Sequence, residues 1–250
     1  MTQEPTGGVQ KPSSVEGPKG GFSTEAKRAV YAAIFGRRTV RCFRPDPVPE
    51  DVLARLLAAA HRAPSVGFSQ PWDFLLVREP KTRGRIGQLF GKAHRAEANL
   101  FDEPQRSKYL SLELDSLSTA PLNVCVTCDP TRAGPIVANS TAIPEADLYS
   151  VCLAVENLWL AARAEGVGVD WVSLLDRAEL REVLGIPPHV VPVAYLSLGY
   201  PKDGFPEEPL LESAGWGERL PLRSLVSYEE WGRRAHEDRW EELDALLEDS

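Results

Sequence analysis

The chain has 250 residues, enough for one large domain or two small ones around a sizeable hydrophobic core. Hydrophobic residues make up 43% of the chain and charged residues 26%, as in ordinary globular proteins, and the net charge of −8 argues against a nucleic-acid-binding surface. No run of about 18 apolar residues could span a membrane, and the start of the chain has no apolar secretory region. We therefore expect a cytoplasmic protein that binds neither nucleic acid nor membrane.

The N-terminal part of the chain predicts a tail followed by two helices. Residues 1–22 are rich in Gly, Pro, Ser and Lys and contain little to bury, which indicates a disordered tail. Ser23 is a candidate N-cap, and apolar residues at helical spacing predict a helix that continues to about Phe35. A second helix is expected from Pro49, which suits a first helical turn, to about Arg62.

A cluster of arginines, Arg37-Arg38-Thr39-Val40-Arg41, follows the first helix. If this segment is extended, alternation places Arg37, Thr39 and Arg41 on one face and Arg38 on the other. Guanidinium groups form charge-assisted bonds of fixed geometry with phosphate, so the segment is a candidate phosphate site. The alternative is a solvated charged edge, which is what most charge runs are.

The stretch Ala63–Trp72 has the composition of a loop, with two prolines, a glycine and two serines. Pro64 removes one amide donor, and Gly67 permits backbone angles that a side chain would disfavour. Backbone amides, the Ser65 hydroxyl and the Gln70 amide would then face one another, which suits the polar edge of a flat heterocycle. The alternative is an ordinary connection between a helix and a strand.

Two polar helices are expected next, from Lys81 to about Asn99 and from about Gln105 to Leu117, interrupted at Pro104. Their apolar stripe is thin, so they should pack weakly and open easily. Two interpretations are open: a plain surface hairpin, or a lid over a bound ligand.

The other expected elements complete a mixed set of helices and strands. The helix from Ala146 to about Ala164 has a broad apolar face and should be central. A shorter helix is expected over Ala178–Leu184, followed by Gly185. Strands are expected at Trp72–Val77, Pro121–Cys128, Val167–Leu175 and Val190–Leu198, with a long loop at 129–144, an aperiodic stretch at 202–222 and a charged, helix-prone tail at 233–250. This mixture indicates an α+β fold in which helices flank one sheet.

The four cysteines, Cys42, Cys125, Cys128 and Cys152, are too few and too scattered for a disulfide scaffold. Cys125 and Cys128 have the spacing of a metal knuckle or redox pair. They lie in a predicted buried strand, however, where residues three apart point to opposite faces. We therefore expect no metal site.

Two of these segments together resemble the FMN-dependent nitroreductase family: Arg-Arg-x-Val-Arg near the N-terminus, and Ala63-Pro64-Ser65 followed by Gln70-Pro71-Trp72. The resemblance narrows to one branch of that family, the 5,6-dimethylbenzimidazole synthases, and covers about residues 22–232. The segments that carry it to this branch are Ala59–Phe68, Val124–Asp129, Asp147–Ser150 and Asn157–Ser173.

The resemblance implies a nitroreductase-like fold, with a central, mainly antiparallel sheet flanked by helices. It implies that residues 23–232 form the FMN domain and that about residues 81–118 form a lid over the flavin. It also implies a homodimer, because in this family the loop that contains Ser65 often contributes to the flavin pocket across the dimer interface.

The resemblance also implies which residues bind FMN. The arginine segment would hold the phosphate and the pyrimidine edge, with Arg37 and Arg41 as the main phosphate anchors, and Ser173 would lie by the reactive end of the ring. The complete set of expected flavin-binding residues is Arg37, Arg38, Thr39, Val40, Arg41, Ser65, Gly67, Gln70, Ser173 and Arg219.

The reaction implied by the branch consumes reduced FMN and O2. The flavin is then the substrate, and it is fragmented to 5,6-dimethylbenzimidazole, the lower ligand of cobalamin, and erythrose 4-phosphate. Ser173 is the expected catalytic residue, together with the residue at position 39. A separate flavin reductase would supply the reduced flavin from NAD(P)H.

One position departs from the branch, which carries an aspartate immediately after the two arginines where this chain has Thr39. A threonine hydroxyl is no acid or base near neutral pH. Asp170 is near Ser173 in sequence, but alternation aims it to the opposite strand face from Trp171 and Ser173. Two alternatives therefore stay open: an NAD(P)H-dependent nitroreductase or flavin oxidoreductase, and a non-catalytic flavin-binding protein.

Overall fold

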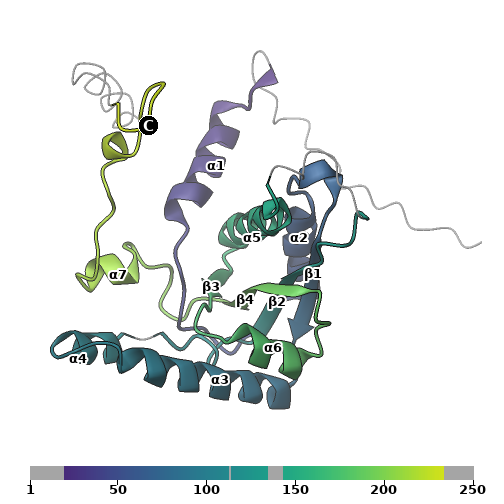
Figure 1. The fold of residues 1–250 in the computed structure, drawn as a ribbon. Coiled ribbons are helices and arrows are strands. Elements are labelled where there is room, and N and C mark those ends of the chain that lie inside the picture. Colours follow the sequence, from purple (N-terminus) through teal and green to yellow (C-terminus); the bar gives the residue numbers. More distant parts are fainter. Residues whose placement is uncertain (1–19, 113, 135–142, 234–250) are drawn as a thin grey trace, which may run out of the picture. The chain divides into compact units, whose positions relative to one another are not determined.

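The computed structural model describes residues 20–112, 114–134 and 143–233 (Figure 1). The chain divides into two compact units, residues 1–207 and residues 208–250. The predicted tails at 1–22 and 233–250 fall almost entirely outside the described residues, as does much of the predicted loop at 129–144. Among the described residues, none of the helices has the length and apolar character needed to cross a membrane.

The first unit is built on a four-stranded sheet with the order β1-β2-β4-β3, in which every neighbouring pair is antiparallel. The strands are β1 (Trp72–Val77), β2 (Leu122–Cys128), β3 (Gly168–Trp171) and β4 (Val191–Gly199). The expected α+β fold with an antiparallel sheet and flanking helices is therefore confirmed.

One face of the sheet is covered by α2 (Glu50–His61) and α5 (Ala146–Ala164), as Figure 1 shows. Both helices turn small and aliphatic side chains inward, and Leu56, Val151 and Leu158 are completely buried among them. The apolar face of α5 runs along nearly its whole length, which explains why the sequence predicted this helix with both ends correct.

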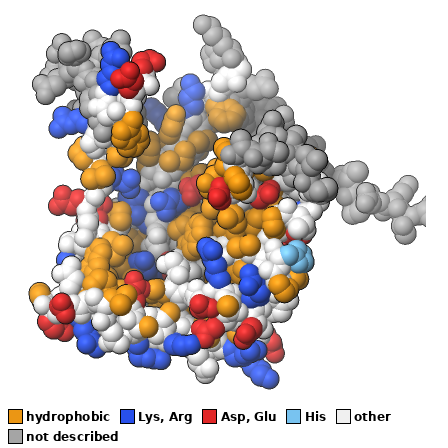
Figure 2. All heavy atoms as spheres, viewed as in Figure 1, with side chains coloured by type: hydrophobic (Ala, Val, Ile, Leu, Met, Phe, Trp, Pro, Cys, Tyr) orange, Lys and Arg blue, Asp and Glu red, His pale blue; other side chains and the backbone are white. Residues whose placement is uncertain are grey.

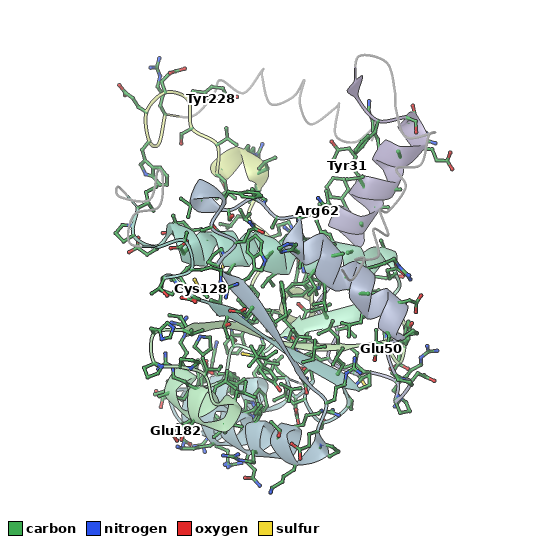
Figure 3. The ribbon with its side chains drawn as sticks, turned by 90° about the vertical axis from the view of Figure 1, so that its right-hand side faces the viewer. Tyr31, Glu50, Arg62, Cys128, Glu182 and Tyr228 are labelled. Atoms are coloured by element: carbon green, nitrogen blue, oxygen red, sulfur yellow. The ribbon has the colours of Figure 1, made fainter. Side chains whose placement is uncertain are left out.

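The opposite face is covered by α3 (Pro80–Ala98) and α6 (Arg177–Leu184). Ile86 and Phe90 of α3 are buried there in one cluster with Tyr195, and Lys92 forms an ion pair with Glu179 of α6. Cys125 belongs to this cluster whereas Cys128 belongs to the other one, so the prediction that they point to opposite faces is confirmed. Figure 3 shows Cys128 on the α5 side of the sheet and Glu182 of α6 on the other.

Helix α1 (Thr24–Gly36) begins as predicted, with the Ala26 amide donating to the Ser23 hydroxyl over 3.2 Å. It packs beside α5 but has no buried residue. Its large apolar side chains are exposed, and they are Val30, Tyr31, Ile34 and Phe35. Figure 2 shows hydrophobic side chains over α1 and α5, and Figure 3 shows Tyr31 on α1 above the layer of α2 and α5.

Two predicted elements are shorter in the structure than in the sequence analysis. Helix α4 (Gln105–Leu110) has six residues, so the prediction that it continues to Leu117 was wrong. The chain instead turns at Asp115, whose carboxylate accepts the amides of Leu117 and Ser118, and this turn delivers Ser116 and Leu117 to the core. Strand β3 ends at Trp171 rather than Leu175, because the chain then leaves the sheet toward the helix cap Asp176.

The remaining short elements lie in connections. A 3-10 turn, η2 (Val66–Phe68), occupies the loop between α2 and β1. The second unit contains α7 (Leu210–Ser213) and the 3-10 turn η3 (Leu222–Ser224), in a stretch for which the sequence showed no periodicity.

Candidate functional site

The arginine segment is extended and lies against β3. Thr39 forms a parallel bridge with Val169, and the Val40 amide donates to the Val169 carbonyl over 3.1 Å. Gly168 allows this close approach, because a Cβ atom there would lie 2.7 Å from the Cβ of Val40. The segment is thus extended, which is the condition on which its two faces were assigned, and it is held at the edge of the sheet.

The three arginines of the segment have different surroundings. Arg38 donates to the carbonyls of Phe35, Arg37 and Glu207 at 2.6–3.0 Å, so it closes the end of α1. Arg37 lies over the ring of Trp159 at 4.8 Å and 3.8 Å from Glu156.

Arg41 lies 3.9 Å from Asp170. The Arg37 and Arg41 side chains remain 31% and 21% exposed, so these two have donors that a ligand can reach. The flavin-binding role of Arg38 stays a prediction.

The loop between α2 and β1 is braced internally and by α5. The Ser65 hydroxyl accepts a hydrogen bond from the backbone N–H of Gln70 over 3.0 Å, and the Ser69 hydroxyl donates to Asp147 over 3.1 Å. The Val66 amide donates to the Ser150 hydroxyl over 3.1 Å.

Several residues of this loop have left-handed backbone angles. Gly67 has φ of 53°, an angle that glycine adopts easily. Phe68 and Gln70 have φ of 57° and 47°. Left-handed non-glycine residues cost free energy and concentrate at functional sites. Phe68 is 81% exposed at the tip of the loop.

The loop and the arginine segment are attached to different ends of α5. Val66 and Ser69 are bonded to the first turns of the helix, whereas Arg163, in its last turn, donates to the carbonyl of Gly36 over 2.8 Å. At 1.5 Å per residue, Ser150 and Arg163 are about 20 Å apart along the helix axis. One chain therefore brings Thr39, Val40 and Arg41 to β3 but holds the Ser65 loop well away from the start of that segment.

Ser173 lies just beyond β3 with an exposed side chain, whereas Asp170 within the strand is only 3% exposed. The Ser116 hydroxyl donates to Asp170 over 2.6 Å. Burial raises the pKa of the Asp170 carboxyl, and the Ser116 hydrogen bond and the Arg41 charge oppose that shift.

The polar surroundings of Asp170 were missed by the sequence analysis. They are Ser116, Asn123 and Ser197, all of them buried. A signal existed, since Asp170 is the one charged residue of the predicted strand Val167–Leu175, and a buried polar residue is more informative than a buried apolar one.

Arg219 lies in the second unit with an exposed side chain, and its amide donates to Glu212 over 3.5 Å. Its expected contact with the flavin phosphate stays a prediction.

The thiols of the buried cysteines Cys125 and Cys128 are unreactive in this environment. Burial raises the pKa of Cys125 and of Cys128 to about 12, so both thiols stay protonated at neutral pH. Within the part of the chain that the structure describes, no three His, Cys, Asp or Glu side chains are grouped so that they could hold a metal ion.

Comparison with known proteins identifies relatives over most of the chain. A family model described as "Nitroreductase family" matches residues 34–200. The chain is 43% identical over 200 residues to a 5,6-dimethylbenzimidazole synthase of Rhodospirillum rubrum, which covers 80% of this chain and 94% of the relative. It is 36% identical to a protein of the same name from Rhodobacter capsulatus, over 85% of this chain and 99% of the relative. These names agree with the branch that the motifs resemble.

A solved structure supports the fold independently. The crystal structure of oxidized iodotyrosine deiodinase bound to FMN and 3-iodo-L-tyrosine superimposes with a TM-score of 0.64. The match has 24% sequence identity and covers 81% of this chain and all of the other. At this identity the likeness establishes the shared fold alone.

Proposed function

The chain belongs to the nitroreductase family, and on that premise we propose that it is a 5,6-dimethylbenzimidazole synthase. The observation that carries the proposal is the similarity, over nearly their full lengths, to two proteins of that name. The proposed substrates are reduced FMN and O2. The products are 5,6-dimethylbenzimidazole, for cobalamin biosynthesis, and erythrose 4-phosphate, while the atoms of the flavin's pyrimidine ring leave as a third fragment.

The donor set beside β3 suits a flavin mononucleotide. Arg37 and Arg41 have partly exposed guanidinium groups, which fit a phosphate and the oxygens of a pyrimidine edge. Thr39, which lies between them in sequence and is half-buried, adds a hydroxyl. When bound, reduced FMN supplies the reducing equivalents and is itself cleaved.

The roles proposed for the protein side chains are binding and orientation. Arg37, Thr39, Val40 and Arg41 hold the phosphate and pyrimidine end, and Ser173 places its hydroxyl at the reactive end of the ring. A flavin-binding role for Arg219 stays an expectation from the resemblance. Loss of one charge-assisted contact, in Arg37→Ala or Arg41→Ala, should weaken FMN binding by about 1.5–3 kcal/mol, or roughly 10- to 150-fold.

We propose that the complete site needs two copies of the chain. Within one chain, opposite ends of α5 hold the arginine segment and the Ser65 loop, which contains Gly67 and Gln70. The Ser65 loop of a second copy would therefore complete the site beside the arginine segment. The exposed apolar side chains of α1, with Tyr149 and Leu153 of α5, offer a surface that such a copy would cover.

The source of reduced flavin is proposed to be a separate flavin reductase that uses NAD(P)H. The four cysteines are unpaired in the structure, which suits the reducing cytoplasm as the compartment of the reaction.

A second candidate function is an NAD(P)H-dependent flavin oxidoreductase, and Thr39 is the observation that favours it. A hydroxyl at this position can bind flavin but supplies no acid or base near neutral pH. This candidate would oxidise NAD(P)H and return FMN intact.

Incubation of the protein with excess reduced FMN in air distinguishes the candidates. The synthase forms 5,6-dimethylbenzimidazole, the oxidoreductase turns over NAD(P)H and returns FMN, and a flavin-binding protein does neither. Single-turnover yields should fall in Ser173→Gly and recover in Ser173→Thr, which restores a hydroxyl at an exposed position.

Position 39 sharpens this test. A general acid or base contributes about 100- to 10,000-fold, so Thr39→Asp should raise the rate of benzimidazole formation if the missing carboxylate limits the reaction. A wild-type rate at or above that of Thr39→Asp would mean that another group has taken over this role.

A further inference from the structure

A continuous chain of buried polar side chains connects α3 to the arginine segment. The Arg83 guanidinium of α3 donates to the Asn123 side-chain oxygen over 3.1 Å, and the Asn123 amide group donates to the Ser197 hydroxyl over 3.0 Å. The Ser197 and Ser116 hydroxyls are 2.9 Å apart, and Ser116 is 2.6 Å from Asp170. Asp170 in turn lies 3.9 Å from Arg41.

The direction of these hydrogen bonds is set by the end members. A serine hydroxyl has one proton to donate, and Ser116 gives its proton to Asp170 because a carboxylate can only accept. Ser197 must then donate to Ser116, which fits its role as acceptor from Asn123. Every donor therefore points from Arg83 toward Asp170. Ser116 donates to Oδ2 of Asp170, whereas Arg41 lies nearest Oδ1.

The network crosses the sheet in register. Asn123 of β2 pairs with Ser197 of β4, and Ser197 pairs with Asp170 of β3. Asn123, Ser197 and Asp170 are each at most 3% exposed, and Ser116 is completely buried. Well-packed apolar residues would stabilise such a core at least as well, so stability alone does not explain a buried carboxylate here.

The Arg41 end shows what the network holds in place. The Arg41 carbonyl accepts from the Thr119 hydroxyl over 3.4 Å, so the connection that supplies Ser116 also contacts the backbone of the arginine segment. A free arginine side chain has many rotamers, and fixing it before a ligand arrives reduces the entropy lost on binding.

We infer that Asp170 is a positioning residue of the flavin site, which fixes Arg41 from behind while Ser116, Ser197 and Asn123 fix Asp170. Asp170 acts through Arg41 because its carboxylate is enclosed and bonded to Ser116, so it cannot itself touch a ligand. This inference rests on the proposed flavin-binding role of Arg41.

A double-mutant cycle tests the inference, with the FMN dissociation constant measured by flavin fluorescence. Asp170→Asn keeps the shape of the side chain but removes the charge that holds Arg41, and it should weaken FMN binding about 2- to 30-fold. In the Arg41→Ala background the same change should alter affinity less than about twofold, because the group it positions is gone.

Arg37→Ala is the matched control, because Arg37 contacts Glu156 and Trp159 rather than the network. The effects of Asp170→Asn and Arg37→Ala should multiply. In the reaction itself, Asp170→Asn should raise KM for reduced FMN by the same factor as the dissociation constant and leave kcat within about twofold.

Three results would overturn the inference: unchanged or tighter FMN binding in Asp170→Asn, effects that multiply with Arg41→Ala, or a loss confined to kcat. If Asp170→Asn does not fold, Ser116→Ala removes the hydrogen bond without touching the charge, and it should show a smaller loss that again vanishes in Arg41→Ala. If the effect of Asp170→Asn depends on Arg41 but the protein forms no 5,6-dimethylbenzimidazole, only the proposed synthase activity is wrong. If the effects of Asp170→Asn and Arg41→Ala on FMN affinity multiply and the protein does form 5,6-dimethylbenzimidazole, only this inference is wrong.

Discussion

Helices α1 and α3 have opposite relations to the core of the first unit. Helix α1 carries Val30, Tyr31, Ile34 and Phe35 but buries no residue. Helix α3 is rich in Lys, Arg and Gly, yet its Ile86 and Phe90 are buried against the sheet. The number of apolar residues in a helix therefore does not determine how many of them are buried. Their burial depends on whether another element offers an apolar surface to pack against. Helix α1 packs beside α5, but among the described residues its large apolar side chains stay exposed.

The largest expected effect compares one isoleucine from each helix. Ile86→Ala removes a completely buried side chain and should cost about 2–5 kcal/mol of unfolding free energy. Ile34 is 41% exposed, so Ile34→Ala should change the stability of the dilute protein by no more than about 0.5 kcal/mol. Urea unfolding at low protein concentration measures both. Equal losses would mean that α1 is packed as firmly as α3.

The second effect asks what covers α1. If a second copy does, Phe35→Ala should remove an interface anchor and weaken dimerisation by about 2–4 kcal/mol, measured by sedimentation equilibrium. Leu100→Ala is the control, since Leu100 is 81% exposed in the turn after α3, outside the proposed interface. A wild-type protein that is monomeric at all concentrations would contradict the shared site proposed above.

The same two helices show what the sequence could predict. Periodicity predicted α1, α2, α3 and α5 to within one or two residues, because caps and apolar spacing are local signals. The sequence predicted weak packing of α3, but Ile86 and Phe90 are buried. Their burial depends on the sheet beneath the helix, and the local sequence of the helix carries no information about that sheet.

The site shows the same division between local and distant information. The extended arginine segment and the left-handed Gly67 are local features. The sequence analysis considered the first as a condition and the second as a conformation that glycine permits. The engagement of Arg38 by the Glu207 carbonyl and the network around Asp170 join residues far apart in sequence. A single sequence provides no information about such pairs, apart from the hint of one acid in an apolar strand.

The third prediction concerns which part of the proposed lid can move. With Ile86 and Phe90 buried and Arg83 bonded to Asn123, the first turns of α3 should be protected from hydrogen exchange with and without FMN. Residues 99–112 contain the exposed Leu100 and Leu110, so exchange there should slow about tenfold or more when FMN binds. Equal protection of 99–112 in both states would make this segment a static connection.

The smallest effect concerns the charged end of the network that holds α3. Because burial raises the pKa of Asp170, the folded protein binds a proton at this carboxyl more tightly than the unfolded chain does. Stability from this group is therefore fully present below the unfolded pKa of about 3.9 and is lost as pH rises through the raised folded pKa.

Asp170→Asn isolates that contribution, because all other groups titrate alike in both proteins. The variant carries a constant cost, since its amide group meets donors from Ser116 and Arg41, but that cost does not depend on pH. Unfolding free energies from urea titrations between about pH 4 and 7 should therefore shift in favour of the wild type as pH falls, by at most about 1.4 kcal/mol per unit of pKa shift.

Glu50→Gln is the control of opposite sign, since a hydrogen bond from Arg78 lowers the pKa of the exposed Glu50 carboxyl and the wild type should lose relative stability on acidification. If the Asp170 difference follows the Glu50 direction instead, Ser116 and Arg41 outweigh burial and the carboxylate is stabilised in place. A flat difference would mean that these opposing effects cancel. In both cases the ionised Asp170 carboxylate would cost the folded state little free energy. The difference in burial between α3 and α1 would then come from apolar packing alone.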